Sequence, residues 1–353
     1  MTENTVGSGN DAGDTVGPAG ILLLNKSPGY TSFDSLNAVK KALGTRKVGH
    51  TGTLDKFASG LLVVLAGWAL KLSPWFDRCD KQYEGVIRFG VETDTLDPEG
   101  TPVETGEVPS REQLEQALTR FRGDIMQAPP AYSAIHIEGK RAYQLARSGA
   151  EVRMEKRPVT IHALELRSYE PPLACVYVHC SKGTYVRSLA RDIALAAGSR
   201  AHLASLERKR VAGFDLGDAV PMDSLALAVA LRPISPETFN ALNLPWIPVD
   251  EAAAKSMRQG KPLNRLLEDV PELRNLSTDY TDLHGLNKIN NLKSALIREN
   301  PRTSSPDSES LGVFCDGAFV AVIVKKQGAG GNRRSDRPFS LNAWSYGYVH
   351  AGA

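Results

Sequence analysis

The 353-residue sequence lacks the features that mark secreted, membrane-spanning or metal-scaffolded proteins. Its four cysteines, Cys79, Cys175, Cys180 and Cys315, include no CxxC pair, so neither a zinc site nor a disulfide framework is indicated. No apolar run approaches the roughly 18–20 residues that cross a membrane. The N-terminus has neither the basic start nor the apolar core of a signal peptide. We therefore expect a cytoplasmic protein without membrane attachment and without a bound metal.

The sequence also lacks an internal repeat and a GxGxxG motif, which argues against a doubly wound nucleotide-binding fold. The net charge of +2 is too small to announce a nucleic-acid partner. Basic residues nevertheless gather at 40–50, 155–157, 208–210 and 332–337. Such clusters are more often solvated surface than RNA-binding stripes, so charge alone leaves the partner open.

The order of apolar patterns favours an α+β fold with a mixed, largely antiparallel central sheet. Strands are expected at 20–26, 61–66, 81–90, 159–166 and 174–181. Helices are expected after the caps Thr31 and Ser110 and after Gly183. The first helix carries the stripe Phe33, Leu36, Val39 and Leu43 and ends at Gly44, the second ends at Gly123, and the third has Tyr185 and Arg187 in its first turn.

The composition changes along the chain. Residues 1–18 form a flexible, mildly acidic tail, and residues 19–248 form one large domain. Residues 249–353 form a small β-rich module, which contains a hairpin around Asp316-Gly317 and a polar insertion at about 263–310.

One acid is hard to place. In the stretch HTGTLDKFASGLLVVLAG, Asp55 stands just before a buried apolar strand. Lys26 at a strand end, Tyr83 on a strand face, and Tyr185 with Arg187 could converge on it. An arginine can hold a buried carboxylate ionised. A turn cap, a core tyrosine and a surface arginine would explain the same residues, so the residues alone leave both interpretations open.

Four segments together favour the functional interpretation. The stretches GHTGTLDKFASGLL, KQYEGVIRFG, QAPPAYSAIHIEGKRAYQLARSG and SKGTYVRSLARD occur in the same order as in the TruB-type tRNA pseudouridine synthase family, which the chain resembles over about 19–215. The resemblance implies a pseudouridine-synthase fold followed by a PUA-like RNA-binding domain. It also implies isomerisation of the T-loop uridine of tRNA (tRNA position 55) by base flipping, without a cofactor or a guide RNA. The expected partner is the T-arm stem-loop, and the expected state is a monomer.

The resemblance assigns four residues to the reaction pocket. Asp55 matches the catalytic carboxylate, which could attack the sugar, attack the base or deprotonate the sugar. Tyr83 matches the tyrosine that stacks on the flipped uracil. Arg187 matches the arginine that pairs with the aspartate, and Tyr185 matches a residue that lines the same pocket.

Three further residues and one segment carry over. His50 matches the histidine that fills the space left by the extruded base, Leu206 matches an apolar pocket residue, and Lys26 matches a motif lysine with a structural role. Residues 124–152 resemble a thumb that closes over the T-arm.

The sequence departs from the family pattern at four positions, none of them a matched catalytic one. Lys56 and Ser27 stand where proline is usual, His136 stands where lysine is common, and Glu207 interrupts an arginine pair. These changes would lower RNA affinity rather than remove the chemistry.

Other functions remain open at this stage. An RNA chaperone would use the same groove without turnover, and a guide-dependent relative would share the fold. An aspartate-dependent hydrolase is disfavoured, because no second acid or histidine partner recurs at useful spacing.

Overall fold

The computed structural model describes residues 17–133, 136–137, 140–141, 154–223, 225–261, 310–325 and 344–349. Most of the predicted tail, most of the predicted thumb and nearly all of the 263–310 insertion lie outside these residues. None of the helices in the described ranges has the length and apolar character that a membrane crossing requires.

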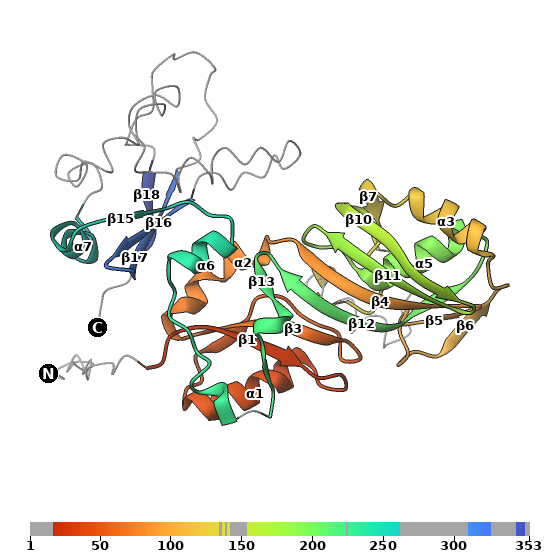
Figure 1. The fold of residues 1–353 in the computed structure, drawn as a ribbon, viewed down its shortest axis with the longest axis horizontal. Helices are drawn as coiled ribbons and strands as arrows, with labels where there is room; N and C mark the ends of the chain where they lie inside the picture. The colour runs from red at the N-terminus through yellow and green to blue at the C-terminus, as the bar shows by residue number, and fades with distance from the viewer. Residues whose placement is uncertain are drawn as a thin grey trace, which may run out of the picture.

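A mixed sheet forms the centre of the molecule, with the strand order β14-β1-β3-β12-β4-β11-β10-β7 and with β2 and β13 paired at its side (Figure 1). The pairs β1–β14 and β3–β12 are parallel and the other pairs are antiparallel, as the sequence predicted. The strands are β1 Gly20–Lys26, β2 Val48–His50, β3 Ser59–Ala66, β4 Lys81–Phe89, β7 Gly123–Gln127, β10 Arg157–Glu170, β11 Leu173–Cys180, β12 Ala201–Val211, β13 Phe214–Asp215 and β14 Val220–Pro221.

Smaller elements complete the described chain. The short hairpin strands are β5 Val91–Thr93, β6 Pro102–Thr105, β8 His136–Ile137 and β9 Lys140–Arg141. The α-helices are α1 Ser32–Leu43, α2 Ser73–Asp77, α3 Arg111–Thr119, α5 Val186–Ala196, α6 Pro236–Ala241 and α7 Glu251–Arg258. Short 3-10 helices are η1 Gly67–Leu72, η2 Leu216–Asp218 and η3 Leu225–Leu227.

Apolar residues on both faces of the sheet are covered, which explains the unbroken apolar run of β3. Leu62 and Val64 pack under α1, whereas Leu61 and Val63 pack on the opposite side with η1 and α2 residues. Farther along the sheet, α3 and α5 cover alternate residues of β4, β11 and β12. In Figure 1 these two helices lie together on one side of the sheet.

Local sequence signals fixed most helix ends. Thr31 caps α1 in a capping box with Asp34, and Gly44 ends it with a φ of 62°. The predicted stripe is wrong for Phe33, which is 64% exposed and carries the Lys40 ammonium 4.7 Å from its ring centroid. The helix capped by Ser110 ends at Thr119, before the predicted end at Gly123, and Gly123 is the first residue of β7.

A second sheet lies at the C-terminal end, with the order β15-β16-β17-β18. Its strands are β15 Trp246–Pro248, β16 Ser310–Cys315, β17 Ala318–Lys325 and β18 Trp344–Val349. The predicted hairpin is present, with Asp316 and Gly317 at φ 48° and 78°. Because β15 pairs with β16, a C-terminal unit in this chain would start before residue 246 rather than at 249. The two-domain division and the PUA-like identity remain predictions.

Aromatic side chains join the two sheets. The rings of Trp68, from η1, and Phe319, from β17, stack with centroids 4.9 Å apart. Phe239 of α6 packs edge-on against Phe314 at 5.2 Å. These residues belong to one buried cluster with apolar side chains of β1 and β3, so the C-terminal sheet shares a core with the central sheet.

Candidate active site

The loop between β2 and β3 carries Asp55, and neighbouring elements hold it in place. The Ser32 hydroxyl, at the start of α1, donates to the Leu54 carbonyl at 3.0 Å and accepts from the Leu54 N–H at 2.8 Å. The Asp55 carbonyl then accepts from the Ala58 N–H at 3.2 Å, which closes a turn directly before β3. Asp55 is therefore fixed at its backbone, as its position before a buried strand led us to expect.

Arg208 of β12 also holds the loop that carries Asp55, through hydrogen bonds from its side chain. It is 2% exposed, and its guanidinium donates to the carbonyls of Leu61, Gly52 and Thr53 at 2.7, 3.1 and 3.4 Å. At Gly60 (φ +102°), a Cβ atom would lie 2.5 Å from the Arg208 carbonyl oxygen, so glycine permits this close strand contact.

Arg208 therefore belongs neither to a solvated surface nor to an exposed RNA-binding stripe, the two interpretations left open for the basic cluster at 208–210. Although Arg208 lines the cavity, its guanidinium donors are engaged with backbone carbonyls rather than presented at the surface. Lys209 lies beside Glu207 and Glu84, at 2.7 and 3.5 Å, and Arg210 lies 3.4 Å from Asp215. The basic side chains of residues 208–210 thus mostly interact with carboxylates and carbonyls of the protein itself.

Lys26 supports the loop from the other side. Its side chain is fully buried, and its ammonium donates to the carbonyls of Ser27 and Tyr30 at 3.1 and 2.7 Å and to that of Lys56 at 3.5 Å. Burial lowers the pKa of Lys26 to about 8, while the negative charge of Asp55 opposes that shift. These contacts fit the structural role expected for Lys26.

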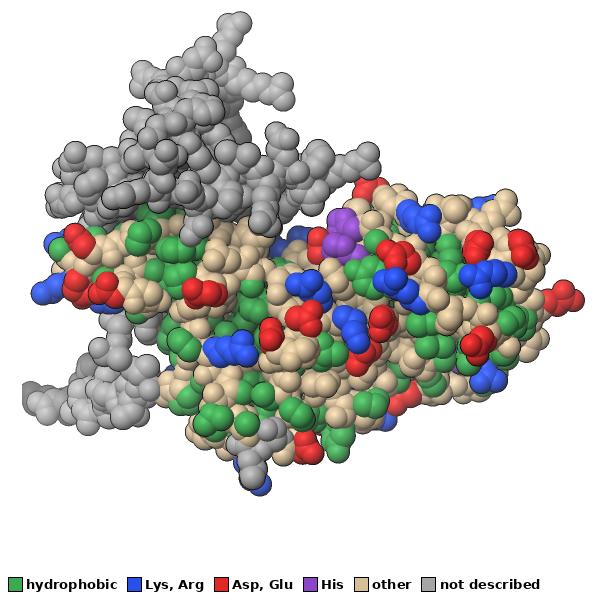
Figure 2. Space-filling model, viewed as in Figure 1, with side chains coloured by type: hydrophobic (Ala, Val, Ile, Leu, Met, Phe, Trp, Pro, Cys, Tyr) green, Lys and Arg blue, Asp and Glu red, His purple; other side chains and the backbone are tan. Residues whose placement is uncertain are grey.

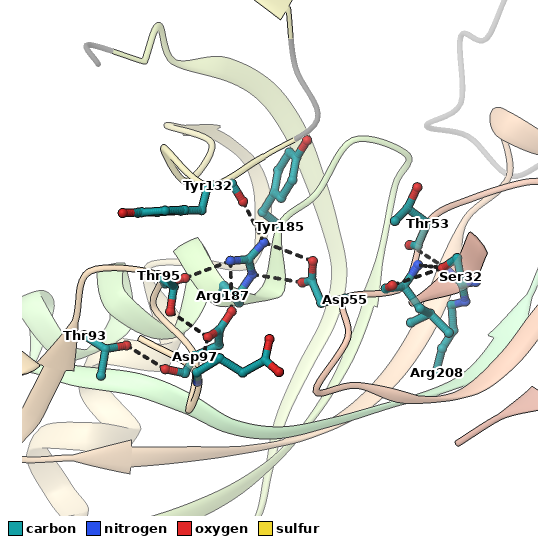
Figure 3. A network of polar contacts seen from close by, with 12 residues as sticks. Ser32, Thr53, Asp55, Thr93, Thr95, Asp97, Tyr132, Tyr185, Arg187 and Arg208 are labelled. Atoms are coloured by element: carbon teal, nitrogen blue, oxygen red, sulfur yellow. Dashed lines mark hydrogen bonds and ion pairs between the residues drawn. The ribbon is translucent and has the colours of Figure 1, made fainter. Parts of the chain in front are cut away.

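The carboxylate of Asp55 meets Arg187 from the start of α5 (Figure 3). Arg187 Nη2 donates to Asp55 Oδ1 at 3.0 Å, and Nε lies 2.9 Å from Oδ2. The remaining donors of Arg187 reach Asp97 at 3.1 Å and the carbonyls of Thr95 and Tyr132 at 2.8 and 3.1 Å. The side chains of Arg187 and Asp97 are only 6% and 8% exposed, so two carboxylates share one buried cation.

This arrangement perturbs the carboxylate of Asp55. Burial raises its pKa above the ordinary value, the Arg187 guanidinium opposes that rise, and the nearby charge of Asp97 adds to it. The side chain still keeps 36% of its surface exposed, so it can be reached by a substrate. A reachable carboxylate with a raised pKa and a fixed cation beside it is suited to nucleophilic or general-base chemistry.

A cavity of about 910 Å³ opens over this pair. Asp55, Tyr83, Tyr185, Arg187 and Leu206 all line it. These five predicted residues come from four distant parts of the chain and meet at one place. The structure therefore brings together the residues whose convergence the sequence alone left open.

Two aromatic side chains shape the cavity wall. Tyr83 of β4 is 8% exposed, and burial raises its pKa to about 12, against the opposing charge of Arg208. Tyr83 is therefore a neutral phenol at physiological pH. Tyr185 is the N-cap of α5 rather than part of its first turn, contrary to the sequence prediction. The amide of Gln127 holds Tyr185 by bonding both its backbone N–H and its carbonyl, at 2.8 and 3.1 Å.

His50 and Lys26 do not line this cavity. His50 ends β2, next to the lining residues Thr51 and Gly52, and its Nδ1 accepts from the Gly52 N–H at 3.3 Å. Burial lowers the pKa of His50 below its ordinary value. Its ring is thus placed at the edge of the Asp55 loop rather than in the cavity wall.

Sequence reasoning missed Asp97, Gln127 and the clamp function of Arg208. Asp97 lies in the acidic stretch DTLDPEG, where several acids look equivalent and only the burial of Asp97 distinguishes it. The departure at Lys56 also has a structural correlate, because Lys56 lies 2.9 Å from Glu99 in that stretch. This exposed pair links the two carboxylate-bearing loops, and such pairs contribute about 0–1 kcal/mol.

Comparison with known proteins identifies a matching family model and similar sequences. Residues 40–186 match the family model described as TruB family pseudouridylate synthase (N terminal domain). The tRNA pseudouridine synthase B of Borreliella burgdorferi (strain ZS7) is 44% identical over 223 residues, which cover 62% of this chain and 79% of that protein. The protein of the same name from Pseudomonas paraeruginosa is 42% identical over 253 residues, or 69% and 83% of the two chains.

Solved structures share the fold at lower identity. A chain in the crystal structure of a Cbf5-Nop10-Gar1 complex superimposes with a TM-score of 0.58 at 20% identity, covering 87% of this chain and 78% of that one. A chain in an H/ACA RNP bound to a substrate RNA containing 2'-deoxyuridine gives a TM-score of 0.55 at 18% identity, covering 90% and 85%. At this identity the likeness speaks for the fold alone.

Proposed function

Because the chain belongs to the TruB family of pseudouridine synthases, which are isomerases, we propose that it converts the T-loop uridine at tRNA position 55 into pseudouridine, with Asp55 as the essential carboxylate. The observation that carries this proposal is the Asp55–Arg187 ion pair at the floor of a cavity large enough for an extruded nucleotide. Curated relatives named tRNA pseudouridine synthase B support tRNA as the substrate.

The reaction needs no net gain or loss of atoms. The bond between uracil N1 and the ribose C1′ breaks, the base turns, and C5 forms the new bond to C1′. The proton on C5 then leaves and N1 gains one. Asp55 can attack the sugar, attack the pyrimidine, or take a proton from the sugar. All three routes need an ionised carboxylate, and Arg187 favours that state against burial.

The cavity geometry also supports base flipping. A carboxylate at its floor cannot reach a uridine that is stacked in an RNA loop, so the nucleotide has to leave the stack first. Tyr83 offers an aromatic face next to Leu206 for the extruded base. His50, at the edge of the Asp55 loop, is placed to contact the RNA that the base leaves behind.

An RNA chaperone is the second candidate, and it would use the same groove without chemistry. A buried arginine shared by two carboxylates favours the enzyme, because binding to an anionic RNA alone would not call for a negatively charged cavity floor. Guide-independent action on the isolated T-arm is part of the proposal, since the relatives at above 40% identity are named as tRNA enzymes.

The test incubates the purified chain alone with a T-arm stem-loop and maps pseudouridine by mass spectrometry. We expect one modified uridine with the wild type and none with Asp55→Asn, whose RNA affinity should stay within a few-fold of wild type. Asp218→Asn, at an exposed position of η2, is the matched control and should retain activity. RNA binding without product in the wild type would favour the chaperone, and product with Asp55→Asn would remove Asp55 from the chemistry.

A further inference from the structure

Three metal-ligand side chains converge at a second place, separate from the cavity. His162 Nε2 lies 3.2 Å from Asp80 Oδ2, and His179 Nε2 lies 4.0 Å from the same oxygen. One donor atom from each residue falls within 4.8 Å of the others, and the two imidazole rings are 4.8 Å apart. None of the three residues lines the cavity over Asp55.

The strand pattern places this cluster on the outer face of the sheet. His179 alternates along β11 with Val178 and Cys180, which are buried in the core under α5. The pairing of β10 with β11 shifts register between Ile161 and Ala163, so His162 occupies a β-bulge. The bulge places the ring of His162 beside that of His179. Figure 2 shows histidine side chains beside an acidic one on this face.

The third ligand is held by backbone contacts. Asp80 directly precedes β4, and its carbonyl accepts from the Ala212 N–H at 2.9 Å, next to the end of β12. The three side chains therefore come from three neighbouring parts of one sheet whose backbones are fixed. Their side chains remain partly exposed, which lets a solvated ion enter and lets the rings rotate.

From this geometry we propose that Asp80, His162 and His179 form a binding site for a divalent late first-row transition-metal ion of the zinc type. Zinc binds histidine nitrogen and carboxylate oxygen at about 2.0–2.2 Å, which sets donor atoms roughly 3–3.5 Å apart around one ion. The His162–Asp80 distance already lies in that range, and donor atoms that are up to 4.8 Å apart have to close by roughly 1.3–1.8 Å as the partly exposed rings rotate. Two imidazoles and one carboxylate leave a coordination position for water.

The electrostatic surroundings fit this ligand set. The two imidazole nitrogens and the Asp80 carboxylate oxygen are the ligand types that zinc sites use. Arg210 is the nearby positive group, and it lies 3.4 Å from the carboxylate of Asp215, which offsets its charge. Hard cations such as Mg²⁺ prefer oxygen-only sites, so a histidine-rich cluster selects against them.

The site would act on the sheet rather than on the reaction. A bound ion would tie the start of β4 to β10 and β11, and β4 carries Tyr83 three residues beyond Asp80. The inference stands on the described cluster alone and does not depend on the proposed tRNA substrate.

The test uses the full chain without an affinity tag, after chelator treatment and dialysis. Titration with ZnCl2 by calorimetry should give one equivalent bound and a higher Tm for the wild type. His162→Gln, His179→Gln and Asp80→Asn should each weaken zinc binding at least tenfold. His50→Gln, which changes a histidine outside the cluster, is the matched control and should bind as the wild type does.

A second measurement needs no substitution. Nitrogen NMR of the histidine rings should show zinc-dependent shifts at Nε2 of two rings, which disappear in His162→Gln, while the ring of His202 stays unchanged. Absence of zinc binding by the wild type would overturn the proposal. Equal binding by the wild type and the three cluster variants would also overturn it, because the ion would then be held elsewhere.

Discussion

Replacing Arg208 by glutamine should destabilise the protein strongly, although the residue belongs to a basic cluster that looks like RNA-binding surface. Its guanidinium is buried and donates to three backbone carbonyls, two of them in the Asp55 loop. A charged hydrogen bond contributes about 1.5–3 kcal/mol, and the two shorter bonds here suggest a loss of roughly 3–6 kcal/mol. At about 2–4 °C per kcal/mol, the Tm should fall by roughly 6–24 °C.

The neighbouring residue provides the control. Lys209 is about 39% exposed and makes only surface ion pairs with Glu84 and Glu207. Lys209→Gln should therefore cost no more than about 1 kcal/mol. Both substitutions remove one positive charge from adjacent positions of β12, so a charge effect would appear in both and a clamp effect only in Arg208→Gln.

Urea unfolding measures the stability of both variants, and binding of a T-arm stem-loop at several salt concentrations measures phosphate contacts. The salt slope of RNA affinity should be the same for Arg208→Gln and the wild type at temperatures where both are folded, because Arg208 contacts no phosphate. A stability loss below about 1 kcal/mol for Arg208→Gln, or a flatter salt slope, would refute the clamp interpretation.

Three further outcomes are expected. Tyr83→Phe should bind RNA almost normally and Tyr83→Ala more weakly by roughly 1–3 kcal/mol, as measured by titration, and equal wild-type-like turnover of both would remove Tyr83 from the site. Because the charge of Asp97 raises the pKa of Asp55, Asp97→Asn should move the acid limb of the rate profile to lower pH, and an unmoved limb would separate the two carboxylates. Replacing three lysines near α1 by glutamine should flatten the slope of log RNA affinity against log salt by about 0.7–0.9 per lost contact. Discrimination between T-arm sequences should not change, and an unchanged slope would place α1 away from RNA. The three lysines are Lys40, Lys41 and Lys47.

Local signals explain why much of the fold was predictable. The capping boxes at Thr31 and Ser110, the alternation of β4 and the turn at Asp316-Gly317 each involve residues within a few positions of one another. Such signals can be recognised in the sequence without knowledge of the tertiary contacts. The exposure of Phe33 could not be predicted in this way. A helical stripe does not show how far the rest of the protein covers the helix, and the ring of Phe33 lies outside the covered face.

The site was predictable only where family motifs marked it. Asp55 and Arg187 are 132 positions apart, so no periodicity links them, and their meeting depends on how β3, β12 and α5 pack. Asp97 and Arg208 both lie outside the four matched segments. Both are ordinary charged residues in the sequence, and what sets them apart is burial, which is a property of the whole chain.

The pairing of β3 with β12 has a consequence for how the protein is made. The carbonyls of Gly52 and Thr53 accept hydrogen bonds from the side chain of Arg208, which is synthesised 156 and 155 positions after them. At a synthesis rate of roughly 5–20 residues per second, that interval lasts roughly 8–30 s. During this time Ser59 and Gly60, at the start of β3, have no β12 partner, so one edge of this strand end is exposed in the nascent chain. An amino-terminal fragment ending before residue 208 would accordingly lack the side chain that holds the Asp55 loop, so its carboxylate would not be fixed in place.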